Sequence, residues 1–426
     1  MKSCQGQSLR VRALLFLILA AAAGAAAAAD IQVQFDDAMR AIEADRLRSA
    51  RETLQQLLAG NPSLHRARLE LARVYYLSED YPAARREAQR VLDDPNTPPS
   101  VRTTVLAFLA QINEDEKRYA QRHQWTPSIY AGLMYDSNVN IGPSSDIIDI
   151  GGLPFVVTPD SQEQSDFAWV VNPAISHVYN PGIQFNAGEH TGNFIWQTDG
   201  SAYYRGYFNE TDFNLGILTL RTGPAWIVPR HWRAWIGLQG DQIWLGGDSL
   251  AFFTTLNPGI TWEVGDNTEI TLEGAVTNRN YWDNDESGRD GWVKEGSVSV
   301  TRYFNDRKLA LQAGVGYADF NADQDNFGYQ APEIHVGAIV QAWQNGIVYA
   351  RAGYTNYNFD GTEPGFGISR DDDEWRFALG FQHDFRSGAL NGWALQGSWV
   401  YTDNSSNVPL YEYNRSVVNL GLARSF

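Results

Sequence analysis

The sequence predicts a multi-domain protein: a short all-α solenoid followed by an antiparallel transmembrane β-barrel of about fourteen strands. Three observations predict it. Residues 31–122 contain a helical repeat, the chain after residue 123 alternates apolar and polar residues, and the connections between the alternating segments are long and short in turn. We expect a signal peptide at residues 1–29, a helical domain at 30–122 and the barrel at 123–426.

The first 29 residues have the pattern of a secretory signal peptide that is cleaved after Ala29. Lys2, Arg10 and Arg12 precede an apolar run that grades into alanines. A membrane anchor is the alternative, but this run is short for a transmembrane helix. The only cysteine, Cys4, lies in the leader, so we expect no disulfide and no thiolate site in the mature chain.

Residues 31–122 contain two helical units with a period of 34 residues. The matched positions are Phe35 and Leu69, Ala38 and Ala72, Ile42 and Tyr76, Ala50 and Ala84, Leu54 and Ala88, Leu57 and Val91, and Leu58 and Leu92. This pattern resembles the tetratricopeptide repeat, a helix pair whose small residues allow close packing. A third helix at about 98–120 is expected to cap the array, whose concave face would bind extended protein segments. An unrelated helical bundle is the alternative.

The remainder of the chain is rich in glycine and alternates with a period of two. The clearest segment is 374–385, where Trp375, Phe377 and Leu379 alternate with Arg376 and Ala378. The expected strands are about 126–136, 166–179, 192–205, 212–222, 231–244, 251–264, 268–282, 292–304, 308–319, 329–343, 347–358, 374–386, 392–402 and 413–426.

The connections separate into two classes. Long loops such as 283–291 and 360–373 follow odd-numbered strands, and short turns such as 265–267 and 305–307 follow even-numbered ones. An even strand number with this segregation is typical of an outer-membrane barrel, in which the apolar face meets lipid and the polar face lines the lumen. Charged residues at mid-strand positions of the polar face are therefore the lumen-lining candidates: Asp199, Asp241, Glu273, Arg351 and Arg376.

Residues near the strand ends and the C-terminus agree with a lipid environment. Aromatic residues that fit the two interfacial girdles are Trp232, Trp244, Trp262, Trp282, Trp292, Trp375, Trp393 and Tyr413. In the closing strand, the apolar side carries Val418, Leu420, Leu422 and the terminal Phe426. This ending resembles the signal read by the barrel-assembly machinery, although Arg424 stands where a hydrophobic residue or Tyr is usual. We expect the Arg424 side chain to extend toward the headgroups.

The barrel opens with the stretch PSIYAGLMYDSNVNIGP at 127–143. Its first strand runs into Asp136, Asn138, Val139 and Asn140, a D-x-N-V-N motif. Together with the order of signal peptide, tetratricopeptide domain and barrel, this motif resembles the surface lipoprotein assembly modulator (Slam) family. Asp and Asn also simply build turns at strand ends. The helical domain is shorter than is usual in that family.

The resemblance implies an outer-membrane translocator that delivers a client lipoprotein or a related secreted protein to the cell surface. It implies a Gram-negative outer membrane, with the helical domain in the periplasm, and the barrel-assembly machinery, membrane lipid and lipopolysaccharide as further partners. The alternative is a polysaccharide-export or nutrient porin. A glycan path would need stacking aromatics and acidic and basic residues inside the barrel, and Trp235 is a candidate for an inward-facing aromatic. The first outer loop, 137–165, is long and apolar. We expect it either to fold into the lumen as a plug or contact the client, or to pack against the barrel rim.

Other function classes are disfavoured. Residues 126–426 hold 35 acidic and 16 basic residues, and this net charge of −19 argues against nucleic acid as a partner. The histidines are scattered and have no visible serine partner, so we expect no catalytic site and no enzyme activity. The acidic runs lack the spacing of a defined calcium loop, and we expect no metal site and no cofactor.

Overall fold

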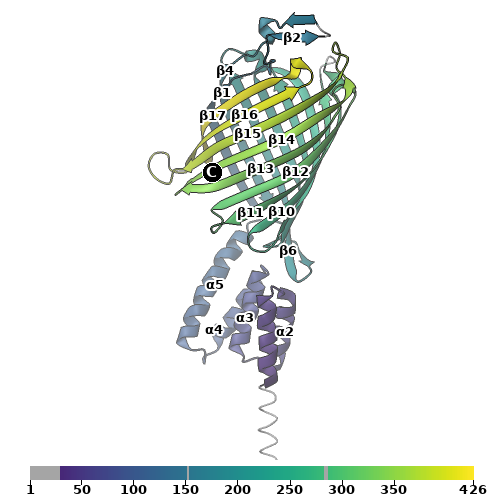
Figure 1. Cartoon of the computed structure of the whole chain (residues 1–426). Helices are drawn as coiled ribbons and strands as arrows, with labels where there is room; N and C mark the ends of the chain where they lie inside the picture. The colour runs from purple at the N-terminus through teal and green to yellow at the C-terminus, as the bar shows by residue number, and fades with distance from the viewer. Residues whose placement is uncertain (1–28, 151–152, 283–285) are drawn as a thin grey trace, which may run out of the picture. The chain divides into compact units, whose positions relative to one another are not determined.

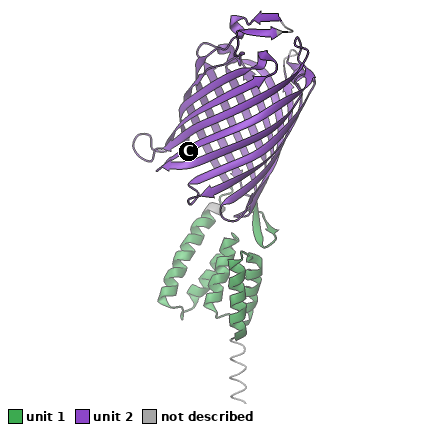
Figure 2. Ribbon diagram, viewed as in Figure 1, with its two compact units in different colours: residues 1–122, 182–193 green, residues 123–181, 194–426 purple. Residues whose placement is uncertain are grey.

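The computed structural model describes residues 29–150, 153–282 and 286–426. The chain divides into two compact units, which Figure 2 colours separately. Unit 1 comprises residues 1–122 and 182–193, and unit 2 comprises residues 123–181 and 194–426. The predicted signal peptide lies outside the described residues, except for Ala29.

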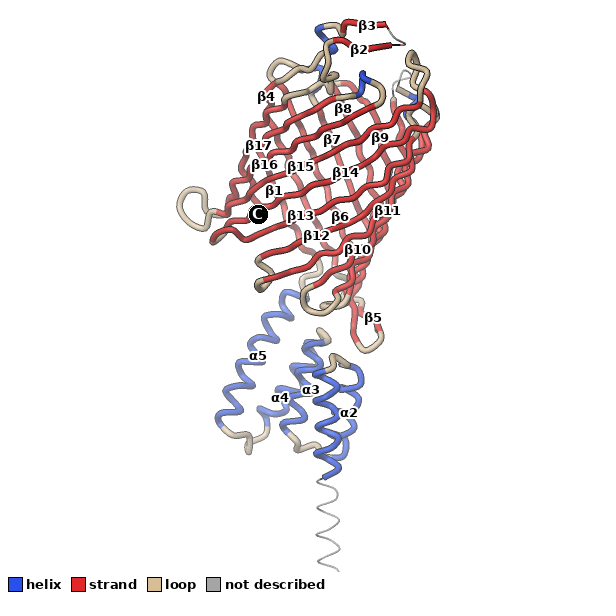
Figure 3. The backbone as a smooth tube through the Cα atoms, viewed as in Figure 1, coloured by secondary structure: helices blue, strands red, loops and turns tan. Residues whose placement is uncertain are grey.

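In the described part of the chain, unit 1 contains five helices (Figures 1 and 3). They are residues 29–43, α2 (Leu47–Gly60), α3 (His65–Leu77), α4 (Tyr81–Asp93) and α5 (Pro99–Tyr119). The start of α4 is fixed by Asp80, whose carboxylate accepts a hydrogen bond from the Ala83 amide at 3.1 Å, and by Pro82 in the first turn. Among the residues described, no helix has the length and apolar character needed to cross a membrane.

Small residues at the matched repeat positions let these helices pack closely. The buried alanines are Ala38, Ala50, Ala72, Ala84 and Ala88, each with no exposed surface. Leu54 and Val91 occupy later matched positions and are also fully buried. The predicted capping helix is α5, which covers the second cluster with Ile112 and its neighbours. The 34-residue repeat is therefore a packing repeat as well as a sequence repeat.

Unit 2 is a closed antiparallel barrel of fourteen strands (Figure 1). The strands are β1 (His123–Asp136), β4 (Asp166–Tyr179), β6 (His190–Tyr207), β7 (Leu215–Val228), β8 (Trp232–Leu245), β9 (Asp248–Glu263), β10 (Thr268–Tyr281), β11 (Gly291–Phe304), β12 (Leu309–Ala322), β13 (Tyr329–Trp343), β14 (Gly346–Thr362), β15 (Ser369–Asp384), β16 (Trp393–Ser406) and β17 (Tyr413–Ser425). Each strand pairs with its neighbour in this order, and β1 pairs with β17 to close the cylinder. The predicted fold class is confirmed.

The two ends of the barrel differ in their connections. We call the end with residues 137–165, 282–290 and 407–412 the loop rim. The other end, with residues 229–231 and 344–345, is the turn rim.

The seam between β1 and β17 is paired from Ser128–Ser425 to Asp136–Val417. Gly132 lies directly opposite Gly421 in this ladder. A Cβ atom on Gly421 would lie only 2.7 Å from ring carbons of Tyr130, so the Tyr130 ring covers the glycine pair. Glycine has little intrinsic preference for a strand, so the packing of the Tyr130 ring on Gly132 and Gly421 supports the ladder where the barrel closes.

The fourth barrel strand ends later than predicted. We expected it at about 212–222, but β7 continues to Val228 because Pro224 does not terminate it. The ladder with β8 skips from Thr222 to Ala225, so the missing amide hydrogen of Pro224 breaks no registered pair. A Cβ atom on Gly223 would lie 1.9 Å from the Ile236 carbonyl oxygen, which restricts this position to glycine. The sequence also did not predict three short strands outside the barrel ladder proper: β2 (Ile147–Ile150), β3 (Leu153–Val156) and β5 (Gln184–Ala187).

Strand β5 and the start of β6 form a hairpin that belongs to unit 1. The Glu189 carboxylate accepts hydrogen bonds from the Ser49 amide at 2.9 Å and from Ser49 Oγ at 3.2 Å, and the Glu189 carbonyl accepts one from the Arg48 amide at 3.1 Å. These amides are in the first turn of α2, whose own N-cap residue, Arg46, provides no side-chain cap. Glu189 therefore caps α2 from a distant part of the sequence. The Ser49 amide is the main cause that lowers the pKa of Glu189.

Replacing Glu189 by Ala should destabilise the helical unit by about 1 kcal/mol, because the Ser49 amide and the Ser49 hydroxyl lose their acceptor, while the Arg48 amide keeps the backbone carbonyl. Because the folded-state pKa of Glu189 is lowered, the cap contributes above the unfolded-state pKa and is lost as the pH falls through the folded-state value. Thermal unfolding followed by far-ultraviolet circular dichroism at pH 7 and pH 3 tests this. Glu163→Ala, in the first loop-rim connection, is the control. Equal melting of E189A and E163A at pH 7 would contradict the cap.

Candidate functional site: the barrel interior and the first-strand motif

The barrel wall has an outer and an inner face. The outer face exposes large apolar side chains, including Leu133 (59%), Leu220 (57%) and Val315 (56%). Residues at alternate positions form the inner face. For example, Arg376 lies between the exposed Trp375 and Phe377 on β15 and therefore points the opposite way.

All five lumen-lining candidates lie on the inner face. Their directly opposite cross-strand neighbours are Ser176 for Asp199, Thr219 for Asp241, Ser297 for Glu273, Gly337 for Arg351, and Thr402 for Arg376. The hydroxyl groups of Ser176 and Thr219 each donate to an aspartate oxygen at 2.6 Å. These contacts hold the two carboxylates against the wall.

The candidates do not form one cluster. Asp199 and Glu273 share a cavity of about 310 Å³ with Arg221. Arg351 lines a separate cavity of about 800 Å³. Its guanidinium lies 3.5 Å from Glu333 on β13, an inner-face acid that our sequence analysis missed. The alternation that identified Arg351 would also have identified Glu333, because the two occupy neighbouring strands of one ladder.

The D-x-N-V-N motif forms a cluster of hydrogen bonds at the loop rim, centred on the buried Asp136. Asp136 is fully buried and accepts hydrogen bonds from the Tyr207 hydroxyl (2.6 Å), Arg415 Nε (2.8 Å) and the Asn138 amide (3.1 Å). Arg415 Nη2 forms a second contact with the same carboxylate. Asp136 thus joins the first strand to the last strand and to β6.

The side chains of Asn138 and Asn140 hold the first loop through hydrogen bonds to its backbone. Asn138 is fully buried, exchanges two hydrogen bonds with the backbone of Gly142 (2.8 and 2.9 Å) and donates to the Asn414 carbonyl. Asn140 donates to the Gln162 carbonyl at 2.7 Å and accepts from the Gln164 amide at 3.0 Å. Between them, the buried Val139 packs with Met134 and its neighbours. These contacts give the motif an architectural role: it fastens both ends of loop 137–165 beside the seam.

Loop 137–165 packs on the rim. Its hairpin, β2–β3, lies beyond the strand ends in Figures 1 and 3. The Ser144 amide donates to the Glu412 carbonyl at 2.8 Å, which anchors the loop to the β16–β17 connection. Of the two alternatives for this loop, the described residues favour the rim over a plug.

The C-terminal residues lie as an outer-face row. Val418 and Leu420 are exposed by 43% and 53%, and Phe426 by 67%. Leu422 continues the same face of β17. The Phe426 amide donates to the Pro127 carbonyl at 2.9 Å, which extends the seam to the last residue.

Of the predicted girdle residues, Trp262, Trp282, Trp292 and Trp375 have exposed side chains. The Arg424 guanidinium lies over the rings of Trp393 (5.6 Å) and Phe426 (4.9 Å). Its side chain thus extends along these rings. The assignment of Tyr413 to a girdle was wrong: Tyr413 lies on the inner face, shares a cavity with Arg279 and donates to Glu374 at 3.4 Å. Tyr413 lies five positions before Val418, so the alternation of the closing strand itself places it on the face opposite the apolar row.

Trp235 lies on the inner face, as the glycan alternative would require, but its ring is not free. A Cβ atom on Gly259 would lie 2.2 Å from the Trp235 ring, and Trp235 Nε1 donates to Asn257 at 3.3 Å. The ring therefore covers the barrel wall. Trp235 is also among the residues that line the cavity of Asp199 and Glu273.

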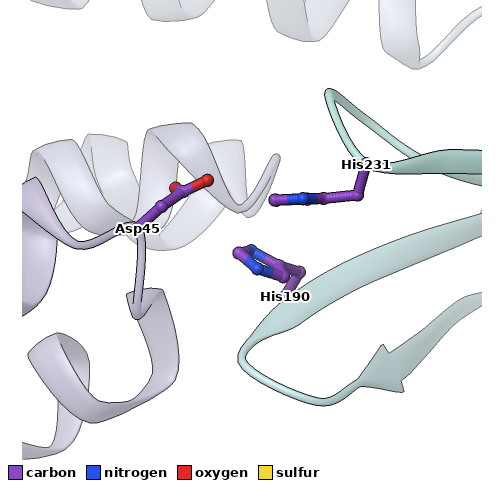
Figure 4. Close-up of side chains that lie close together, drawn as sticks. All are labelled: Asp45, His190 and His231. Atoms are coloured by element: carbon purple, nitrogen blue, oxygen red, sulfur yellow. The ribbon is translucent and has the colours of Figure 1, made fainter. Parts of the chain in front are cut away.

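Two potential metal ligands lie close together in unit 1. Ligand atoms of Asp45 and His190 are within 4.8 Å of one another (Figure 4). His231, also drawn there, belongs to unit 2.

A closed antiparallel barrel with an apolar outer face defines an outer-membrane β-barrel. Residues 241–426 match the family model described as surface lipoprotein assembly modifier, and residues 41–112 match a tetratricopeptide-repeat model. The two matches confirm the resemblance to the Slam family with its tetratricopeptide domain and barrel. Neither description is that of an enzyme.

No curated protein matches the chain in sequence. Several solved structures resemble it distantly. A Pseudomonas aeruginosa FadL homologue is 10% identical over 72% of this chain and 90% of its own, with a TM-score of 0.38. An anion-selective porin from Comamonas acidovorans is 10% identical over 71% and 99%, with a TM-score of 0.39. A loop-deletion mutant of OmpT, an outer-membrane protein of Vibrio cholerae, is 6% identical over 72% and 100%, with a TM-score of 0.41.

Replacing Asp136 by Asn should destabilise the barrel by about 3 kcal/mol, because Arg415 would keep its charge in a site that has lost the opposing carboxylate. Urea unfolding of the refolded protein, followed by heat-modifiable mobility on gels, measures this. The control is Asp319→Asn, whose partner Lys294 is 3.9 Å away and 63% exposed, so the change should cost less than about 1 kcal/mol. Equal unfolding midpoints for the two variants would show that the Asp136–Arg415 pair does not stabilise the barrel.

Proposed function

We propose that this protein is an outer-membrane translocator that delivers a lipoprotein or related protein client to the cell surface. The observation that carries the proposal is the match of residues 241–426 to the surface lipoprotein assembly modifier model. The tetratricopeptide match supports it, because such repeats bind extended protein segments.

The connectivity of the barrel supports a periplasmic helical domain. Strand β1 begins at the turn rim, where the helical domain joins it through His123. In single-chain outer-membrane barrels, the short turns face the periplasm and the long loops face the exterior. By this rule the helical domain meets clients before export.

The inner face supplies the path in this proposal. Asp199, Asp241, Glu273, Arg351 and Arg376 place both signs of charge along it, so it presents a polar surface to a passing chain. The further proposed partners are the barrel-assembly machinery, which would recognise the C-terminal outer-face row, and outer-membrane lipid with lipopolysaccharide.

The direct test co-expresses the chain with a lipoprotein encoded beside it and treats intact cells with protease. We expect the lipoprotein to be digested only when this chain is present, because its route to the surface passes through the barrel. Total lipoprotein in lysed cells is the control. Equal digestion with and without the chain would refute the translocator.

Deleting Phe426 should lower the amount of folded barrel in the outer membrane several-fold, because the terminal aromatic belongs to the proposed assembly signal. Heat-modifiable mobility in isolated outer membranes measures it. Leu390→Ala removes another exposed apolar side chain, at the turn rim, and should leave the level unchanged. Equal levels for the two variants would remove Phe426 from the signal.

A further inference from the structure

A cavity of about 580 Å³ lies inside the barrel toward the loop rim. Its wall carries three arginines, Arg279, Arg289 and Arg370, among tyrosine and phenylalanine rings. Strands β10 and β15 provide two of the arginines, and the β10–β11 loop provides the third. This basic lining contrasts with the net charge of −19 over residues 126–426.

Aromatic rings hold all three guanidinium groups. Arg279 lies 4.6 Å from the Phe320 ring centroid, Arg289 lies 4.9 Å from that of Phe327, and Arg370 lies 3.6 Å from that of Phe359. A guanidinium that stacks by its face keeps its N–H groups in the plane, available to an acceptor at the edge. The rings therefore preorganise donors without consuming them.

Two of the three charges are already compensated. Arg289 Nε lies 3.0 Å from Glu286, and Arg370 Nε lies 3.2 Å from Asp372. The other acid of the cavity, Glu374, is paired with Arg376 at 3.2 Å. Among the described residues, Arg279 has no ion pair and its Nε, which is shielded from solvent, has no acceptor. Within the described part of the chain, one guanidinium of the cavity thus lacks a counter-charge.

We propose that this cavity is an oxyanion site, centred on Arg279, that binds carboxylate side chains of an extended polypeptide. A carboxylate matches the planar donor fork of arginine with two hydrogen bonds. Because the strand ladder is closed on all sides, ligands reach the cavity along the barrel interior and not from the bilayer. The choice of a polypeptide as the ligand rests on the proposed function. In that function the cavity is a binding site for acidic segments of the client along the barrel interior.

Isothermal titration calorimetry of the full-length protein in detergent micelles tests the proposal, with hexaglutamate as the probe and hexaglutamine as the neutral control. We expect hexaglutamate alone to bind wild type, and Arg279→Gln to weaken binding at least about tenfold, because a charged hydrogen-bond pair is lost. Arg279→Lys keeps the charge but loses the fork, so it should bind with intermediate affinity. The matched control is Arg221→Gln, on the inner face of β7 and outside this cavity, which should bind as wild type does.

Three results would overturn the site: no binding to wild type, equal binding to R279Q and wild type, or an equal loss in R279Q and R221Q. Tighter binding of an oligogalacturonate than of hexaglutamate would overturn the choice of polypeptide. Heat-modifiable mobility verifies that each variant is folded. The calorimetry does not depend on client delivery, so a failure of the translocator in the protease assay is distinguishable from a failure of this site.

Discussion

The structure depends on closure of one hydrogen-bonded ladder, the pairing of β1 with β17. In hydrocarbon an unpaired backbone group costs several kcal/mol, so a sheet survives there only without edges. Closure also determines which way every side chain points. Once the outer row of Leu133 and Leu420 faces lipid, the alternate row of β1 and β17 must face inward. The polar residues of the alternate row therefore face the interior because the barrel closes along the β1–β17 seam.

The seam is fastened at both ends by different contacts. At the loop rim, the buried Asp136 joins Arg415 and Tyr207 and brings the first, last and third barrel strands together. At the turn rim, Phe426 extends the backbone ladder to Pro127. A motif that marks the family resemblance is therefore architectural. The same loop rim carries the arginine cavity.

The helical unit also depends on a contact between residues that are far apart in the sequence. Its close helix packing follows from alanines at matched repeat positions, but the first turn of α2 is capped by Glu189 from the β5–β6 hairpin. A hairpin that interrupts the barrel sequence thereby takes part in the stability of the helices. The family match and the repeat match fall on these two units separately.

The sequence by itself predicted the repeat, the strand number and the face of the five lumen-lining candidates, because a 34-residue period and a period of two can both be read along the chain without knowledge of the fold. The predictions failed for Tyr413 and where Pro224 sits in an interrupted ladder. Only the tertiary structure decided the Asp136–Arg415 pair, the Glu189 cap and the surroundings of Arg279. These contacts join residues far apart in the chain, and the register and closure of the sheet, which no local pattern encodes, bring them together.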